Sequence, residues 1–139
     1  MQTFQTIQEA EQHLVSQFDW LEDWQQKYAY IIDLGKALPE LPADLMTDAH
    51  LVRGCQAQVW MVADIEGGRF GLQATSDARI VQGLIAIMCL LYQDRTLAAI
   101  QAYDHGFADR LGLRSHLSPT RANGLNHMLA FIRQQAMVA

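Results

Sequence analysis

The sequence predicts an α+β fold, in which a small antiparallel sheet of about three strands packs against helices. The apolar residues repeat at a helical interval near both ends of the chain and at every second residue between positions 58 and 75. The pair Gly67-Gly68 interrupts this second pattern, as is typical of a hairpin turn. Residues 80–91 are apolar on nearly all sides, which predicts a helix inside the core against the sheet. Helices, hairpin and helices in that order indicate an α+β protein.

The spacing in residues 4–18 predicts a first amphipathic helix, and Asp19 is the expected N-cap of a second. Gly35 and the prolines at positions 39 and 42 should end helical structure. Further along, Ser76 and Asp77 are expected to cap the apolar helix, and Thr96 to cap a short one. Ser118-Pro119 should open the last helix, whose inward residues are Leu125, Leu129 and Ile132.

The hairpin turn also predicts the register of the two strands. With Gly67 and Gly68 in the turn, Glu66 opposes Arg69, and the residues Ile65, Ala63 and Met61 oppose Phe70, Leu72 and Ala74. All apolar members of these pairs then share one face, and the pair beside the turn has opposite charges. Residues 50–52 are expected to add a third strand.

The totals fit one domain over residues 1–139, with half of the residues hydrophobic and a net charge of −5. That charge argues against a broad nucleic-acid interface. The longest apolar run is too short to cross a bilayer, and the first residues do not resemble a secretory signal. We therefore expect a cytoplasmic protein whose two cysteines are reduced thiols.

The chemistry is expected at Cys55, which joins the third candidate strand to the hairpin. Gly54 frees the backbone there, so that Cys55 can lie at the tip of a bend, and Arg53 could favour its thiolate. From the residues alone, a reactive thiol and a small, partly buried hydrophobic residue remain equally open. Cys89 lies within the apolar helix and is expected to be structural.

Residues 54–60, G-C-Q-A-Q-V-W, resemble the G-C-x-x-x-V-W signature of SufE-like partners of cysteine desulfurases. Four further segments resemble the family's pattern in the same order. They are W-Q-Q-K-Y (24–28), L-G-K-A-L-P (34–39), S-D-A followed by I-V-Q-G-L (76–84), and L-S-P-T-R-A-N-G-L (117–125). The resemblance covers roughly residues 20–135.

The resemblance implies the fold of SufE and of iron–sulfur scaffolds of the IscU type. It implies that Cys55 accepts persulfide sulfur from a cysteine desulfurase of the SufS or CsdA type, stimulates that enzyme and delivers sulfur for cluster assembly. The loop would be sheltered by apolar residues until the partner docks. Supporting residues would be Arg121, Gly54, Trp60 and Asp77, with Trp60 close enough to line the pocket. The protein would need no cofactor of its own, since pyridoxal phosphate belongs to the desulfurase.

Two positions depart from the family's pattern. Gln82 stands where a basic residue is usual, and Ala74-Thr75 replaces a Gly-Asp pair. Both could alter docking electrostatics while leaving the cysteine chemistry intact. Residues 111–114 resemble the CsdE branch and residues 55–60 resemble SufE itself, so the branch stays unassigned.

Three other functions remain as alternatives. A cysteine-dependent hydrolase would use Cys55 as nucleophile and one of the five histidines as base. A non-carrying adaptor would bind the desulfurase without accepting sulfur. A zinc site would need His50, Cys55, His105 and His116, whose spacing matches no ligand motif.

Overall fold

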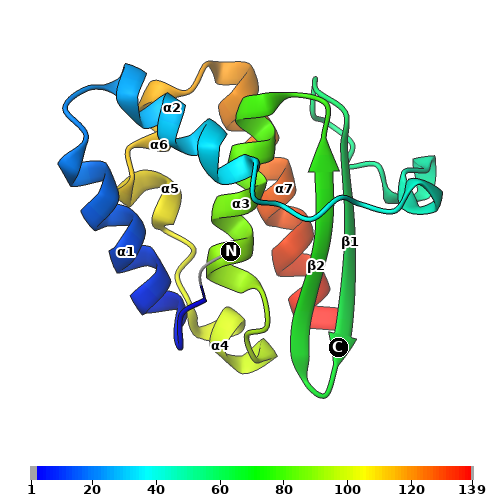
Figure 1. The fold of residues 1–139 in the computed structure, drawn as a ribbon. Coiled ribbons are helices and arrows are strands. Elements are labelled where there is room, and N and C mark those ends of the chain that lie inside the picture. Colours follow the sequence, from blue (N-terminus) through cyan, green and yellow to red (C-terminus); the bar gives the residue numbers. More distant parts are fainter. Residues whose placement is uncertain (1–2, 139) are drawn as a thin grey trace.

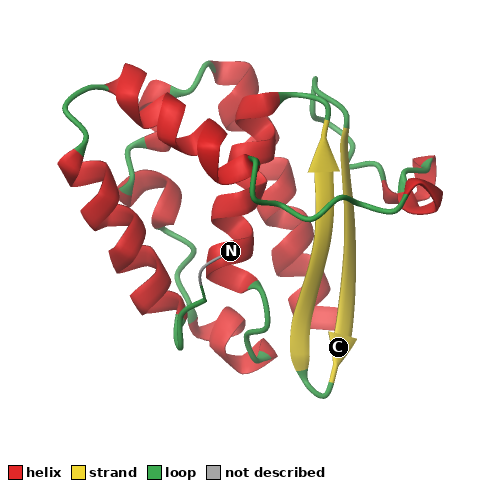
Figure 2. Ribbon diagram, viewed as in Figure 1, coloured by secondary structure: helices red, strands yellow, loops and turns green. Residues whose placement is uncertain are grey.

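The computed structural model describes residues 3–138 as helices around one two-stranded antiparallel sheet (Figure 1; Figure 2). The elements follow the expected order of helices, hairpin and helices, which confirms the α+β class. They are α1 (Ile7–Trp20), α2 (Trp24–Gly35), the 3₁₀ turns η1 (Ala43–Leu45) and η2 (Asp48–His50), β1 (Val59–Glu66), β2 (Arg69–Ser76), α3 (Arg79–Tyr92), α4 (Leu97–Ala102), α5 (Phe107–Arg110), α6 (Leu113–His116) and α7 (Pro119–Val138).

The hairpin forms with the predicted register. Gly67 and Gly68 both have positive φ, and Glu66 pairs with Arg69 beside them. The apolar pairs lie on one face, where Met61 and Phe70 are fully buried in the hydrophobic core. Opposite charges at the turn and apolar side chains on one face therefore select this register over its neighbours.

The third strand expected at residues 50–52 does not form. Residues 48–50 form the turn η2 instead, and the His50 Nδ1 lies 2.8 Å from the Leu45 carbonyl oxygen. Leu51 makes only an isolated bridge to Trp60, and the chain turns away again at Gly54, where φ is +89°. Turns on both sides leave too few extended residues for a strand.

Helix α3 lies between the hairpin and the α1–α2 pair (Figure 1). Eleven of its residues are buried, as a helix apolar on all sides requires. The inward residues expected for the last helix, Leu125, Leu129 and Ile132, are also buried. Among residues 3–138, no helix combines the length and apolar character needed to cross a membrane.

Two of the expected helix caps form in the structure, and two do not. The Thr96 hydroxyl accepts from the Ala99 amide, and the Ser118 hydroxyl accepts from the Arg121 amide. Asp19 lies inside α1, whose helical hydrogen bonds continue past it, and Asp23 caps α2 instead. Helix α3 begins after Ala78 without any side-chain cap, because the Asp77 carboxylate bonds elsewhere.

Candidate functional site

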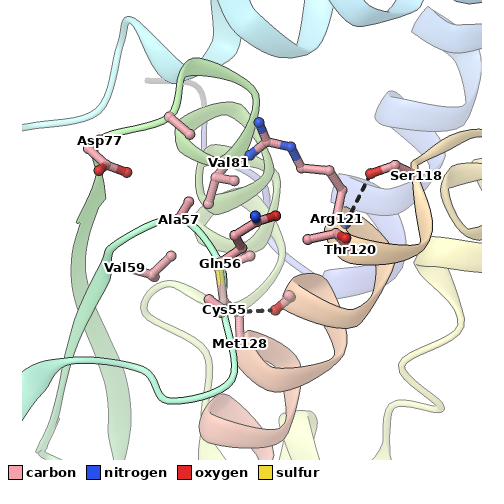
Figure 3. A pocket seen from close by; sticks show the side chains of 12 residues that line it. Cys55, Gln56, Ala57, Val59, Asp77, Val81, Ser118, Thr120, Arg121 and Met128 are labelled. Carbon is pink, nitrogen blue, oxygen red and sulfur yellow. Dashed lines mark hydrogen bonds between the residues drawn. The ribbon is translucent and has the colours of Figure 1, made fainter.

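Cys55 lies in a pocket of about 550 Å³ that three separate parts of the chain build (Figure 3). These parts are the loop that enters β1, the β2–α3 junction and the first turns of α7. The twelve lining residues are Cys55, Gln56, Ala57, Val59, Asp77, Ala78, Val81, Ser118, Thr120, Arg121, Gly124 and Met128. The pocket therefore combines apolar residues near the hairpin with polar residues at the start of α7.

Gly54 gives the Cys55 loop its path. Its φ of +89° is a conformation that side chains disfavour. A Cβ on Gly54 would also lie 2.5 Å from Nε2 of His127. Both the backbone conformation and this contact therefore exclude a side chain at position 54. The turn directs the Cys55 thiol toward α7, where Sγ donates to the Gly124 carbonyl oxygen at 3.6 Å. This positive φ agrees with the bend expected at Gly54.

The Cys55 thiol is half-buried, and burial raises its pKa above the ordinary value. Desolvation alone determines the direction of this shift, so the expected help from Arg53 finds no support in this conformation. The protonated thiol thus predominates near neutral pH. Burial therefore lowers the reactivity of the resting Cys55 thiol, and a change in its surroundings or a nearby base would raise it.

Arg121 lines the pocket from the first turn of α7. Ser118 caps this turn by accepting from the Arg121 amide at 3.2 Å, which directs the side chain from a rigid helical position. In Figure 3 the Arg121 guanidinium lies well away from the Cys55 sulfur. Arg121 therefore adds a positive charge to the pocket at a place away from the resting thiol.

Asp77 joins the Cys55 loop to the end of β2. Its Oδ1 accepts from the Gln58 amide at 3.1 Å, and its own amide donates to the Gln58 carbonyl oxygen at 3.3 Å. These two bonds extend the hairpin ladder by one pair and hold the chain just after the loop. Asp77 lines the pocket while serving as a tether.

The sequence placed Trp60 at the pocket, and this is wrong. Successive side chains of a strand point to opposite faces, so the buried Val59 lines the pocket and Trp60 does not. Sequence reasoning also missed Gly124 and Met128. Both lie on the helical face of Arg121, three and seven residues further along, so the helical period of the last segment could have found them.

The model of the SufE family, described as an Fe–S metabolism associated domain, matches residues 12–136. This chain belongs to the SufE family. An uncharacterized SufE-like protein of Rhizobium etli is 39% identical over 130 residues, which cover 90% of this chain and 88% of that protein. Another from Rhizobium meliloti is 37% identical over 128 residues, covering 88% and 91%.

The fold of this SufE-family protein also has a solved counterpart. The solution structure of a hypothetical protein from Thermus thermophilus matches with a TM-score of 0.77 and 20% identity, covering 94% of this chain and 95% of that one. The likeness confirms the architecture. The expected SufE fold is thus supported by the family match and by an independent structure.

Cys89 does not share the Cys55 pocket. It is 8% exposed within α3, and burial raises the pKa of its thiol to about 12. A thiol that stays protonated at physiological pH is a poor nucleophile. Its packing agrees with the structural role expected from the sequence. Among residues 3–138, no three His, Cys, Asp or Glu side chains converge as a metal site would require.

Proposed function

We propose that this SufE-family protein accepts sulfane sulfur on Cys55 from a cysteine desulfurase and passes it on for iron–sulfur cluster assembly. The observation that carries the proposal is the Cys55 thiol in an open pocket built by segments of the family's motifs. The other cysteine is buried and has a strongly raised pKa. Cys55 is thus the thiol suited to exchange with a partner.

The transfer balances without an oxidant or a reductant. The Cys55 thiolate attacks the terminal sulfur of a persulfide on the desulfurase, and a new S–S bond forms on Cys55. The S–S bond of the donor breaks, and the donor's cysteine leaves as a thiolate. Cys55 then carries the persulfide, and a downstream scaffold or another acceptor thiol takes the sulfur by the same exchange. The pyridoxal phosphate chemistry that makes the first persulfide belongs to the desulfurase.

The apolar part and the charged part of the pocket would support this exchange in different ways. Apolar side chains such as Val59, Val81 and Met128 surround the thiol and would limit access of water and small reductants to a persulfide. At the α7 end, Arg121 supplies a positive charge that would attract the anionic persulfide of a docked partner. Because burial favours the neutral thiol, docking that brings Cys55 out of this environment would raise its thiolate fraction and favour reaction in the complex.

The direct test is the substitution Cys55→Ser with Cys89→Ala as its matched control. Each protein is incubated with the desulfurase and cysteine, and its intact mass is measured with and without reductant. Wild type and Cys89→Ala should gain 32 Da, the mass of one sulfur atom, and should lose it on reduction. Cys55→Ser should fold, gain no sulfur and fail to stimulate sulfide production by the desulfurase.

Two outcomes would favour the alternatives. If Cys55→Ser stimulates the desulfurase as well as wild type, the protein is an adaptor that does not carry sulfur. An acyl adduct on Cys55, formed from an ester without any desulfurase, would indicate a cysteine hydrolase. The hydrogen bond of Cys55 favours the carrier, because Sγ donates to a carbonyl oxygen and not to a histidine base.

A further inference from the structure

His127 packs against the backbone immediately before Cys55. Its ring atoms Nε2, Cε1 and Cδ2 lie 2.5–2.7 Å from the point where a Cβ of Gly54 would stand. The outer edge of the imidazole therefore occupies the space of the absent side chain. The contact joins α7 to the loop at the one residue whose φ of +89° sets the direction of the Cys55 turn.

Helix α7 contacts the same loop a second time, one turn earlier. The carbonyl oxygen of Gly124 accepts from Cys55 Sγ at 3.6 Å. Gly124 and His127 are three residues apart and thus lie on one face of the helix. Backbone and thiol are therefore both held against α7, by a ring and by a carbonyl group.

Few hydrogen bonds hold the loop in this position. Apart from the backbone turn at residues 53–54, this thiol–carbonyl bond is the one hydrogen bond that the described residues show for positions 53 to 57. A thiol is a weak donor, so that bond contributes little. The bonds from Val52 to Val59 and from Gln58 to Asp77 close the base of the loop, and Cys55 and Ala57 pack against the hydrophobic core. On the α7 side, the His127 ring, itself exposed to solvent, is the bulky group beside Gly54.

We propose that His127 is a positioning residue that holds the Cys55 loop against α7, and that Cys55 becomes fully accessible when this packing opens. The proposal rests on the proposed function only for its purpose, which is to hide the carrier thiol between partners. The loop then exchanges between a closed and an open state, and reagents react mainly with the open one. Removing the ring should raise the open population.

The test is the rate at which iodoacetamide, a small neutral reagent, alkylates Cys55 at constant pH. Intact mass gives the rate, and peptide mapping assigns the site. His127→Ala should react on the order of fivefold faster, as loss of one ordinary packing contact implies. His127→Phe should restore a rate near wild type, because another flat ring fills the space. Gln134→Ala, an exposed residue seven positions further on the same helix face, should react like wild type.

The result that overturns the proposal is equally direct. An alkylation rate for His127→Ala equal to or below that of wild type would show that the ring does not restrain the loop. Modification of Cys89 together with Cys55 would show general loosening of the fold, and would overturn it as well. The assay contains no desulfurase, so a result against the proposed function, such as full stimulation of the desulfurase by Cys55→Ser, would leave the inference about His127 standing.

Discussion

Gly83 of α3 lies against the backbone of Ile31 in α2, so closely that a Cβ on Gly83 would be 2.1 Å from the Ile31 carbonyl oxygen. Gly35 approaches α3 in return, since its Cβ would lie 2.7 Å from the Gly83 amide nitrogen. The two helices thus cross at a pair of glycines. This contact sets how far α3 stands from α2 and, through α3, where the pocket wall at Val81 lies.

Gly83→Ala should therefore lower the free energy of unfolding by about 3 kcal/mol, because the added methyl group forces two buried backbones apart. Urea unfolding followed by circular dichroism measures the change. Gly71→Ala is the matched control, since its Cβ would make an ordinary 3.4 Å contact with the Asp64 carbonyl oxygen. It should stay within about 0.5 kcal/mol of wild type. Equal stability of both variants would contradict the close helix crossing.

Cys89→Ala should destabilise the protein by about 1 kcal/mol at pH 7 through lost packing, while sulfur acceptance survives. Burial raises the pKa of Cys89 to about 12, so the folded state retains a proton that the unfolded state releases above about pH 9. The wild type should therefore lose stability between these two pH values, and the deficit of Cys89→Ala should shrink there. Urea titrations at pH 7 and pH 10 measure the difference. A deficit that is constant with pH would contradict the burial of this thiol.

Arg121→Ala should slow sulfur transfer about tenfold, the effect of losing one charge-assisted contact worth about 1.4 kcal/mol in the transition state. The melting temperature should hardly change, because the Ser118 cap uses the Arg121 backbone and survives. Arg133→Ala removes the same charge from α7 about 18 Å further along the helix and should transfer sulfur normally. Equal rates of sulfur transfer for both variants would show that the Arg121 side chain has no role in the transfer.

The reactivity of free Cys55 should depend on pH in a direction set by its burial. Because burial raises its pKa, the thiolate fraction should still be increasing above pH 8.5, where an ordinary cysteine is half ionised. The rate of alkylation in the Cys89→Ala background, measured from pH 7 to pH 9.5, should rise throughout. A plateau below pH 8 would mean that a nearby charge stabilises the thiolate.

Asp77→Ala should loosen the exit of the Cys55 loop without unfolding the hairpin. The substitution removes the acceptor of the Gln58 amide, which should then exchange its hydrogen faster. Hydrogen exchange followed by NMR at Gln58 and at Met61 separates this local effect from a general one. Asp77→Asn keeps an oxygen acceptor and should exchange nearly as slowly as wild type. Unchanged exchange in Asp77→Ala would show that the tether is dispensable.

Sequence patterns predicted best where neighbours along the chain decide the structure. The hairpin register follows from alternation around Gly67 and Gly68, and Thr96 caps the helix that begins beside it. Asp19 failed because Asp23 offers an equivalent cap after the apolar repeat of α1 has ended. Residues 50–52 failed because turns on both sides limit strand pairing to one bridge.

The predictions about the site also succeeded where the local backbone decides and failed where tertiary contacts decide. The G-C motif identified Cys55, and Gly54 indicated a bend, since both depend on local backbone. The shelter of the thiol comes from α7, which no local pattern places beside the loop. Trp60 was assigned to the pocket by closeness in sequence, while strand alternation points Val59 there instead. Tertiary contact decides these positions.

The contact between Cys55 and Gly124 spans 69 residues of chain. At roughly 5–20 residues per second, a ribosome needs about 3–14 s to make that stretch. Throughout this interval the nascent protein carries its cysteine without the helix that will cover it. The thiol of a newly made chain is thus more open to oxidants than that of a mature one. Any chain truncated before α7 would keep the Cys55 thiol uncovered for its whole lifetime.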